Sequence, residues 1–269
     1  MDASRPVNRA AGAAGSAAGG ARAAGVAGTV DFGRLRVSPE EKSARVEEVF
    51  RTVAGRYDAM NDLMSGGFHR ILKRVAVDST GLRPGQRALD LAGGTGDLSR
   101  LLAPIVGPAG AVVLCDVNAS MLAVGRDRVI DAGLANVETV RADAEALPFA
   151  TESFDSVVIA FGLRNLTDKE RGLREMHLVL RPGGSAVVLE FSTARDPWIA
   201  RASGLWQSFW PLLGRVVAGD AAPYRYLVDS IAVHPGRVVL ATMMEDAGFA
   251  DVAADGLLGG VVALHRGRK

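Results

Sequence analysis

The stretch Ala88-Leu-Asp90-Leu-Ala-Gly93-Gly94-Thr95-Gly96-Asp97-Leu98 decides the fold of this chain. It joins a short apolar run to a glycine-rich turn and then to a helix start, which is the strand–loop–helix arrangement of nucleotide-binding folds. Glycines in such a loop allow the backbone to approach a ligand closely. A glycine cluster after a strand can also be a plain tight turn, so the sequence around it has to decide between a ligand site and a turn.

The sequence that follows favours a ligand site. Residues 112–116, Val-Val-Leu-Cys-Asp, predict a second strand that ends in Asp116, twenty residues after Gly96. This is the usual distance from a glycine loop to the acid that binds the hydroxyls of a ribose. A tight turn alone would not require an acid at this place.

Two features of the loop indicate a nucleoside that carries positive charge. Asp90 and Asp97 bracket the glycines, and their carboxylates would repel a pyrophosphate, which such sites hold at the positive end of a helix dipole. The dinucleotide fingerprint also has a glycine three residues after Gly96, where this chain has Ser99. S-adenosylmethionine (SAM), a sulfonium nucleoside without phosphate, therefore fits better than a nicotinamide dinucleotide.

Composition limits the other classes of partner. The 269 residues are 48% hydrophobic, enough for one large domain with a substantial core, and 31 basic residues nearly balance 30 acidic ones, which argues against nucleic acid. The single cysteine, Cys115, excludes an intrachain disulfide, and the four histidines are too scattered to predict a metal site. No apolar run approaches the ~18–20 residues that cross a bilayer. Residues 1–30 are rich in Ala and Gly, and we expect a disordered tail there.

Strands and helices alternate along most of the chain. The predicted strands, set by apolar runs between turn residues, cover 87–91, 112–116, 137–141, 154–161, 185–191, 251–254 and 260–265. The predicted helices lie within 98–105, 118–133, 167–184 and 237–246. This order predicts an α/β fold, a doubly wound and mostly parallel seven-stranded Rossmann-like sheet. Its ligand should lie over the carboxyl ends of the strands, where Asp90, Asp116, Asp143 and the segment 160–165 fall.

Two segments depart from this alternation. Ser38-Pro39 is a helix-start signal, with serine as the cap and proline in the first turn, and we expect residues 31–80 to form an N-terminal helical lid. Residues 192–235 hold all three tryptophans and do not alternate like a strand, so we expect a helical insertion before the last strands. The tryptophans would either pack in the core or line an apolar channel. Residues 31–269 would then form one domain that binds SAM.

Five blocks of the chain carry a more specific signal. They are Val49–Arg70, which contains Tyr57–Arg70 (Tyr-Asp-Ala-Met-Asn-Asp-Leu-Met-Ser-Gly-Gly-Phe-His-Arg), Phe161–Asn165 (Phe-Gly-Leu-Arg-Asn), Leu189–Ser192, Tyr224–Ile231 and Gly260–Gly267. Together they resemble the ubiquinone/menaquinone biosynthesis C-methyltransferases of the UbiE type, which are class I SAM-dependent methyltransferases. The resemblance covers residues 32–269, and its first two blocks are the most specific.

The resemblance implies methylation of a ring carbon of a polyprenylated quinol. The substrate would be demethylmenaquinol, 2-methoxy-6-polyprenyl-1,4-benzoquinol, or both. The glycine loop, the ribose acid and the resemblance together give the expected SAM-binding residues: Asp90, Gly93, Gly94, Thr95, Gly96, Asp116, Asp143, Ala144 and Ala160. Many members have serine or glycine where this chain has Ala160, so only its backbone could contribute. Many also have an aromatic residue where Leu72 stands in the expected lid.

Methylation at carbon needs an electron-rich ring, which a quinol supplies as one hydroxyl loses its proton. A base, or a cation that stabilises the phenolate, would assist this step. The candidates for these roles are Tyr57, His69, Arg164, Asn165 and Tyr226. Each has a purely structural alternative, such as capping a helix, anchoring a loop or packing the lid.

Other functions remain open from the sequence. A SAM methyltransferase of another small aromatic or lipid substrate, a nicotinamide-dependent quinone oxidoreductase and a non-catalytic SAM-binding scaffold share much of this pattern. For the methyltransferase we expect a cytoplasmic location, with peripheral contact at the inner face of the membrane because the substrate has a lipid tail. Other quinone-biosynthesis enzymes and a second copy of the chain are the protein partners we consider.

Overall fold

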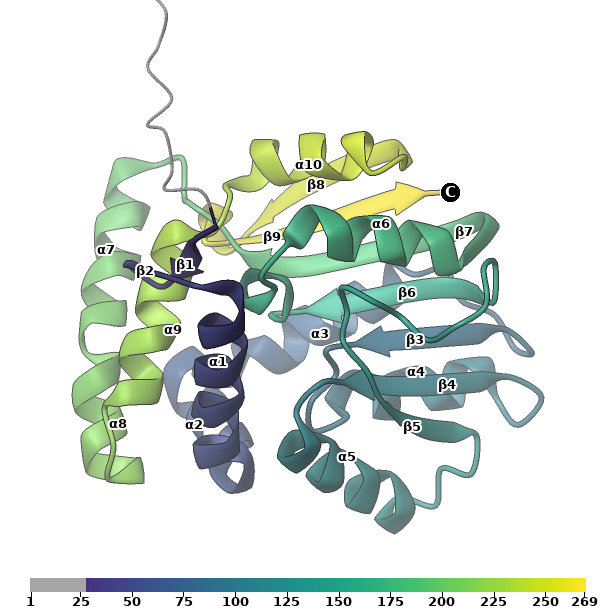
Figure 1. The fold of residues 1–269 in the computed structure, drawn as a ribbon, viewed down its shortest axis with the longest axis horizontal. Helices are drawn as coiled ribbons and strands as arrows, with labels where there is room; N and C mark the ends of the chain where they lie inside the picture. Colours follow the sequence, from purple (N-terminus) through teal and green to yellow (C-terminus); the bar gives the residue numbers. More distant parts are fainter. Residues whose placement is uncertain (1–27) are drawn as a thin grey trace, which may run out of the picture.

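The computed structural model describes residues 28–269, and the side chains of all of these except 56–59 and 216–218. The predicted tail, residues 1–30, lies almost wholly outside the described residues. The described residues form one seven-stranded sheet with helices on both faces, and a further group of helices lies at one end of its strands (Figure 1).

The sheet has the strand order β5-β4-β3-β6-β7-β9-β8. The strands are β3 (Arg87–Leu91), β4 (Ala111–Asp116), β5 (Val137–Arg141), β6 (Phe154–Ala160), β7 (Leu180–Phe191), β8 (Ala250–Leu257) and β9 (Val262–Arg268). Strands β3 to β7 pair in parallel, β9 is antiparallel to β7, and β8 is antiparallel to β9. The order reverses at β3, so the glycine loop that follows β3 lies at the switch point where ligands bind in doubly wound sheets. The predicted fold class is confirmed.

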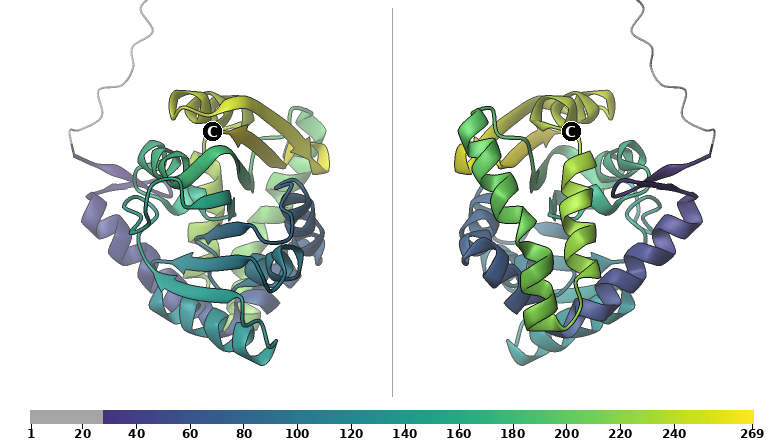
Figure 2. Two further views of the ribbon diagram at one scale, coloured as in Figure 1. Left: turned by 90° about the vertical axis from the view of Figure 1, so that its right-hand side faces the viewer. Right: turned by 90° about the vertical axis from the view of Figure 1, so that its left-hand side faces the viewer.

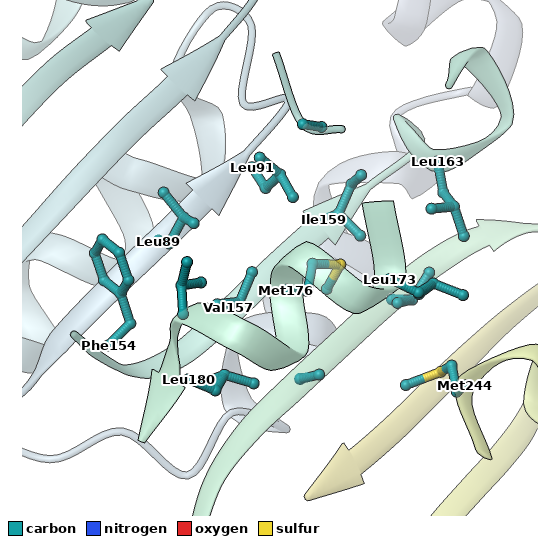
Figure 3. Packing of buried hydrophobic residues seen from close by; sticks show 14 of the residues in the cluster. Leu89, Leu91, Phe154, Val157, Ile159, Leu163, Leu173, Met176, Leu180 and Met244 are labelled. Carbon is teal, nitrogen blue, oxygen red and sulfur yellow. The ribbon is translucent and has the colours of Figure 1, made fainter. Parts of the chain in front are cut away.

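The two faces of the sheet are covered by α3 (Phe68–Asp78), α4 (Asp97–Val106), α5 (Ala119–Asp131), α6 (Lys169–Val179) and α10 (Arg237–Asp246). Strand β6 illustrates the division, since its side chains alternate between two buried clusters. Val157 and Ile159 pack with Met176 of α6 and Met244 of α10 (Figure 3), whereas Val158 packs with α4 on the other face. A strand that is buried on both faces appears in the sequence as a continuous apolar run.

The N-terminal segment begins with a small hairpin and continues as helices. The hairpin joins β1 (Val30–Phe32) to β2 (Leu35–Val37), and α1 (Pro39–Val53), η1 (Ala54–Arg56), α2 (Tyr57–Ser65) and α3 (Phe68–Asp78) follow. The Ser38 side chain accepts a hydrogen bond from the Glu41 backbone at 3.2 Å and so caps α1 as its sequence indicates. The hairpin was not predicted, because strands of three residues carry too short a pattern.

The segment before the last two strands forms α7 (Pro197–Ser208), α8 (Trp210–Ala218) and α9 (Ala222–Val233). A third buried cluster joins these helices to the N-terminal ones, with Trp210, Tyr224 and Leu227 against Val53 and Met64. The right-hand view of Figure 2 looks onto this helical group, which lies in front of the sheet at the carboxyl ends of the parallel strands. Two short turns, η2 (Leu163–Asn165) and η3 (Leu258–Gly260), complete the fold.

Strand boundaries in the C-terminal half differ from the predicted ones. We expected residues 181–184 to close α6, but α6 ends at Val179 and β7 begins at Leu180. Arg181, Pro182 and Gly183 are exposed, and the Gly183 backbone nitrogen donates to the Lys269 carbonyl at 2.7 Å, so backbone pairing rather than apolar burial carries the strand through these residues. Strands β8 and β9 are also longer than predicted, because polar residues on an antiparallel pair at the sheet edge continue the pairing.

Among the described residues, no single helix has the length and hydropathy to span a bilayer, and one pair, α9 with α10, passes only when its 73° bend is ignored. Both of these helices contribute to the core, through buried Tyr224 in α9 and Leu240 and Met244 in α10.

Candidate functional site

The glycine loop after β3 requires glycine at each of its three positions. Gly94 and Gly96 have positive φ values, 56° and 79°, a region that side chains disfavour. Gly93 is limited by space, since a Cβ atom there would lie 2.6 Å from Cγ of Asp90. The loop therefore brings bare backbone to the carboxyl edge of the sheet, next to the start of α4.

A first cavity opens above this loop and crosses the carboxyl ends of β3, β4 and β6. The predicted SAM residues that line it are Gly93, Gly94, Thr95, Asp116, Asp143, Ala144 and Ala160. Helix α1 forms the opposite wall with Val46, Glu47 and Phe50. The cavity is thus enclosed between the sheet edge and the N-terminal helix.

Asp116 is held at the centre of the first cavity by two backbone donors. Its Oδ2 accepts from the Gly94 nitrogen at 2.9 Å and its Oδ1 from the Asn118 nitrogen at 2.8 Å. Burial raises the pKa of this carboxyl to about 6, against these hydrogen bonds, which lower it. Asn118 caps α5 through Oδ1, and its Nδ2 donates to the Glu47 carbonyl at 2.9 Å, so the same corner ties α1 to the sheet.

Asp90 and Asp97 do not face the cavity as the charge argument from the sequence required. Asp90 is fully buried beneath the loop, where its Oδ2 accepts from the backbone and the hydroxyl of Ser99 at 2.8 and 2.6 Å. Burial raises the pKa of Asp90 to about 7. Asp97 accepts from Lys73 Nζ at 2.7 Å. The two carboxyls hold the loop in place. Gly96, like Asp90, does not line the first cavity. Contact of Asp90 and Gly96 with SAM therefore stays a prediction.

A second cavity of about 230 Å³ adjoins the first one. It lies between α2, α3, α7 and α8 and is mostly apolar; its lining includes Met64, Phe68, His69, Leu72, Phe161, Arg164, Phe191, Trp206, Trp210, Leu227 and Leu258. Lys73 and Phe161 line both cavities. Two ligands bound in these cavities would therefore be neighbours.

Of the predicted catalytic residues, the structure brings His69 and Arg164 to the second cavity and Asn165 to the first. Tyr226 lines neither one. Its hydroxyl donates to Asn165 Oδ1 at 2.9 Å, its ring stacks on Phe32 with 4.5 Å between centroids, and burial raises its pKa to about 12. Tyr57 begins α2, but its side chain lies outside the described part of the structure.

Arg164 is part of a buried ion pair. Its Nη1 lies 3.0 Å from Oε1 of Glu190, which is fully buried, and also donates to the Phe161 carbonyl. The guanidinium carbon lies 5.4 Å from the centre of the Phe191 ring. The Nε nitrogen is buried without a hydrogen-bond partner in the described structure. Arg164 is thus fixed in the wall between η2 and β7 rather than free at the surface.

His69 is buried and faces the second cavity from α3. Its Nδ1 lies 2.8 Å from the hydroxyl of Ser65, and that hydroxyl donates its single proton to the Asn61 carbonyl at 2.7 Å. Nδ1 must then carry the imidazole proton, which leaves Nε2 as the basic nitrogen. Burial, followed by the charge of Lys73, lowers the pKa of His69 below its usual value, so the ring is neutral at pH 7.

Several residues of the site were not found by sequence reasoning. Glu190 lies in the block Leu189–Ser192, but neither Glu190 nor Lys73 was assigned a role, because the partners of their buried charges lie far away in the sequence. Gly125 had a signal, a glycine inside a predicted helix. A Cβ atom there would lie 2.7 Å from the Gly94 carbonyl, so α5 must approach the loop closely.

The comparisons with known proteins agree with this arrangement. The model of the ubiE/COQ5 methyltransferase family matches residues 38–269. The chain belongs to this family. A curated relative from Ectopseudomonas mendocina (strain ymp), named ubiquinone/menaquinone biosynthesis C-methyltransferase UbiE, is 54% identical over 243 residues, 90% of this chain and 95% of the relative. A relative of the same name from Pseudomonas syringae pv. tomato is 53% identical over equal shares.

The solved structures support the fold. A SAM-dependent methyltransferase from Aquifex aeolicus superimposes with a TM-score of 0.57 and 18% identity, over 78% of this chain and 96% of the other. At that identity the match speaks for the architecture alone. The family membership predicted from the five sequence blocks is confirmed, and the nicotinamide-dependent oxidoreductase gains no support.

Proposed function

We propose that this protein transfers the methyl group of SAM to a ring carbon of a polyprenylated quinol, in ubiquinone biosynthesis, menaquinone biosynthesis or both. The observation that carries the proposal is the pair of adjoining cavities that share Lys73 and Phe161. One has a glycine loop and a ribose acid, and the other is apolar with a neutral histidine. The names of the curated relatives supply the quinone pathway.

The residues of the first cavity fit SAM. Asp116 would bind the ribose hydroxyls, the bare backbone of Gly93 and Gly94 would lie against the amino-acid part, and the segment at Asp143 and Ala144 would flank the adenine. SAM supplies an electrophilic methyl group on a sulfonium. We propose a cytoplasmic location with contact to the membrane that holds the substrate, because the lipid tail of the quinol keeps it there.

His69 is the residue we assign as the base. A hydroxyl of the quinol in the second cavity would donate its proton to Nε2, and the ortho carbon of the resulting phenolate would become the nucleophile. As this carbon bonds to the methyl group, the methyl–sulfur bond breaks and S-adenosylhomocysteine leaves, and the ring carbon then loses its own proton to restore the aromatic quinol. Ser65 fixes the proton on Nδ1 and so keeps Nε2 available. The buried Nε of Arg164 is a remaining donor for a second quinol oxygen.

Alignment supplies the rest of the rate enhancement. Holding ring carbon and methyl group in line can contribute ~7–11 kcal/mol. A phenolate and a sulfonium lose their charges as the new bond forms, so an apolar surrounding favours that step over the separated ions. The aromatic walls of the second cavity, Phe161, Phe191 and Trp210, provide such a surrounding.

The experiment is a methyl-transfer assay with labelled SAM and each of the two reduced quinols, read by mass spectrometry of the product. The His69→Gln variant should lose about 100-fold in kcat with unchanged SAM affinity, since a positioned base contributes roughly 10²–10⁴-fold. Wild-type activity should fall with decreasing pH below about 6.5, as His69 becomes protonated. Ser65→Ala should lower kcat less and alter this acid limb. Methylation of neither quinol would refute the function, and an unchanged His69→Gln enzyme would refute the base.

A further inference from the structure

Helix α7 has one half-buried face, with Ala200, Ser203 and Gln207, and an opposite face that is exposed. None of its twelve residues is fully buried. Its large apolar side chains are on the exposed side: Trp198 is 76% exposed and Leu205 is 64% exposed. A helix of a globular protein normally packs its apolar side chains against the core. Figure 1 places α7 at the outer side of the helical group, away from the sheet. Exposed apolar patches of this kind mark sites of interaction.

The apolar surface continues from α7 to the second cavity. Phe68 of α3, Trp206 of α7 and Leu258 of η3 line that cavity and are each about half exposed, so the cavity reaches the surface between them. The Trp206 indole nitrogen donates to the Met64 carbonyl at 2.8 Å and ties α7 to α2. Ile71, one turn after Phe68, extends the surface by a side chain that is 58% exposed.

The charged residues on this surface are mostly basic, although the exposed Asp196 caps the start of α7. Arg201 is the only charged residue of α7, and its guanidinium carbon lies 5.6 Å from the centre of the Trp198 ring. Arg195 just before the helix and Arg74, one turn after Ile71, are exposed as well. Tryptophan and arginine beside each other on an exposed helix are typical of segments that lie in the interface of a membrane with anionic lipids.

The substrate expected under the proposed function needs such a surface. A cavity of about 230 Å³ has room for a quinol ring and only the first part of a long isoprenoid chain. The remainder must leave between Phe68, Trp206 and Leu258, where contact with water would be unfavourable. A bilayer in contact with the cavity mouth would keep the chain in an apolar medium.

We propose that Trp198, Leu205 and Trp206 of α7, with Phe68, Ile71 and Leu258 around the cavity mouth, form a docking surface for a bilayer that contains anionic lipids. These residues are called the α7 surface, and the role we give it depends on the proposed function, because only a substrate with a lipid tail needs it. The α7 surface holds the mouth of the second cavity against the membrane, so that the ring enters the protein while the isoprenoid tail stays in the lipid.

The test is flotation of the full chain with vesicles of phosphatidylethanolamine and phosphatidylglycerol. Wild type should float with the vesicles, less so in high salt or without the anionic lipid. Trp198→Glu/Leu205→Glu should weaken vesicle binding at least tenfold, and Trp198→Ala/Leu205→Ala should give a smaller loss without added charge. Ile130→Glu on α5, where the wild-type residue is 66% exposed, is the matched control and should bind as wild type.

Activity separates this proposal from the proposed function. With a quinol that has a short, water-soluble chain, Trp198→Glu/Leu205→Glu should keep wild-type turnover, since neither residue lines a cavity; with a long-chain quinol in vesicles its turnover should fall. If wild type does not methylate the short-chain quinol, the proposed function is wrong, and the flotation result alone then decides whether the α7 surface binds a membrane. The docking proposal is overturned if wild type does not float or if the glutamate variant floats equally well. It is also overturned if that variant only changes the oligomeric state in light scattering, because α7 would then bind a second copy.

Discussion

At the scale of single residues, the site depends on side chains that are fixed by the backbone before any ligand binds. Asp116 is the clearest case, since both of its oxygens accept backbone hydrogen bonds from the loop and from the start of α5. A ribose would then meet a carboxylate that has little freedom left to lose, which favours affinity.

Replacing Asp116 by alanine should therefore weaken SAM binding by about 10- to 100-fold, because hydrogen bonds to a charged group are each worth roughly 1.5–3 kcal/mol. Asp116→Asn keeps one acceptor and should lose less. Isothermal titration with SAM measures both, and Asp127→Ala, an exposed carboxylate on α5, is the control. Equal SAM affinity in Asp116→Ala and wild type would show that the ribose lies elsewhere.

The residue scale also shows where sequence reasoning reached its limit. The spacing from Gly96 to Asp116 identified the ribose acid correctly as a lining residue, because a strand–loop–helix unit fixes that distance locally. Asp90 and Asp97 could not be placed in the same way. Their partners, Ser99 and Lys73, decide whether the carboxyls face the ligand or the interior, and Lys73 comes from α3 in the preceding segment.

At the scale of elements, α5 approaches the glycine loop so closely that a Gly→Ala substitution in this helix should lower stability, the opposite of its usual effect. Alanine in place of a helical glycine usually stabilises by up to about 1 kcal/mol. At Gly125 the new Cβ would lie 2.7 Å from the Gly94 carbonyl, so the helix or the loop must move. Gly125→Ala should lower stability by about 1–3 kcal/mol and weaken SAM binding.

Gly204 of α7 is the matched control, because a Cβ atom there meets nothing within 4 Å. Gly204→Ala should raise the melting temperature slightly and leave SAM affinity unchanged. Thermal denaturation and titration of the two variants give the comparison. A stabilised Gly125→Ala protein with normal affinity would contradict the tight packing of α5 on the loop.

The elements themselves were predictable to different degrees for physical reasons. Strands β3 and β5 match their predicted bounds: β3 is a buried apolar run between turns, whereas β5 is a half-exposed edge strand that its β-branched residues, Val137, Thr139 and Val140, indicate. The β1–β2 hairpin and the extra length of β7 escaped prediction because backbone pairing, not burial, defines them. Helices were expected in the 192–235 segment. A local pattern could not show which of their faces would be buried, and in α7 no residue is fully buried.

At the scale of the whole molecule, nearly balanced charge means that pH acts through individual buried groups rather than through net repulsion. His234, at the end of α9, is the most affected histidine. Both of its ring nitrogens are buried without a hydrogen-bond partner in the described structure. Burial, the largest cause, lowers its pKa from 6.5 to about 4.

A histidine that is kept neutral by folding contributes stability above its unfolded pKa and loses that contribution as the pH falls toward its folded pKa. Between pH 7.5 and pH 5, His234 should cost the fold up to about 2 kcal/mol. Asp90 and Asp116 act in the opposite direction, because their raised pKa values favour the folded state as the pH falls. The pH dependence of wild type alone would mix these effects.

The difference in the free energy of unfolding between wild type and His234→Leu isolates the effect of the histidine, since both proteins contain Asp90 and Asp116. Leucine fills the site without a titratable group, so the free energy of unfolding of wild type relative to the variant should fall by up to about 2 kcal/mol from pH 7.5 to pH 5. Urea denaturation at several pH values measures this difference. Val233→Ala, an exposed neighbour, should show the pH dependence of wild type. If His234→Leu and wild type lose stability in parallel on acidification, the ring must be solvated or protonated in the folded protein.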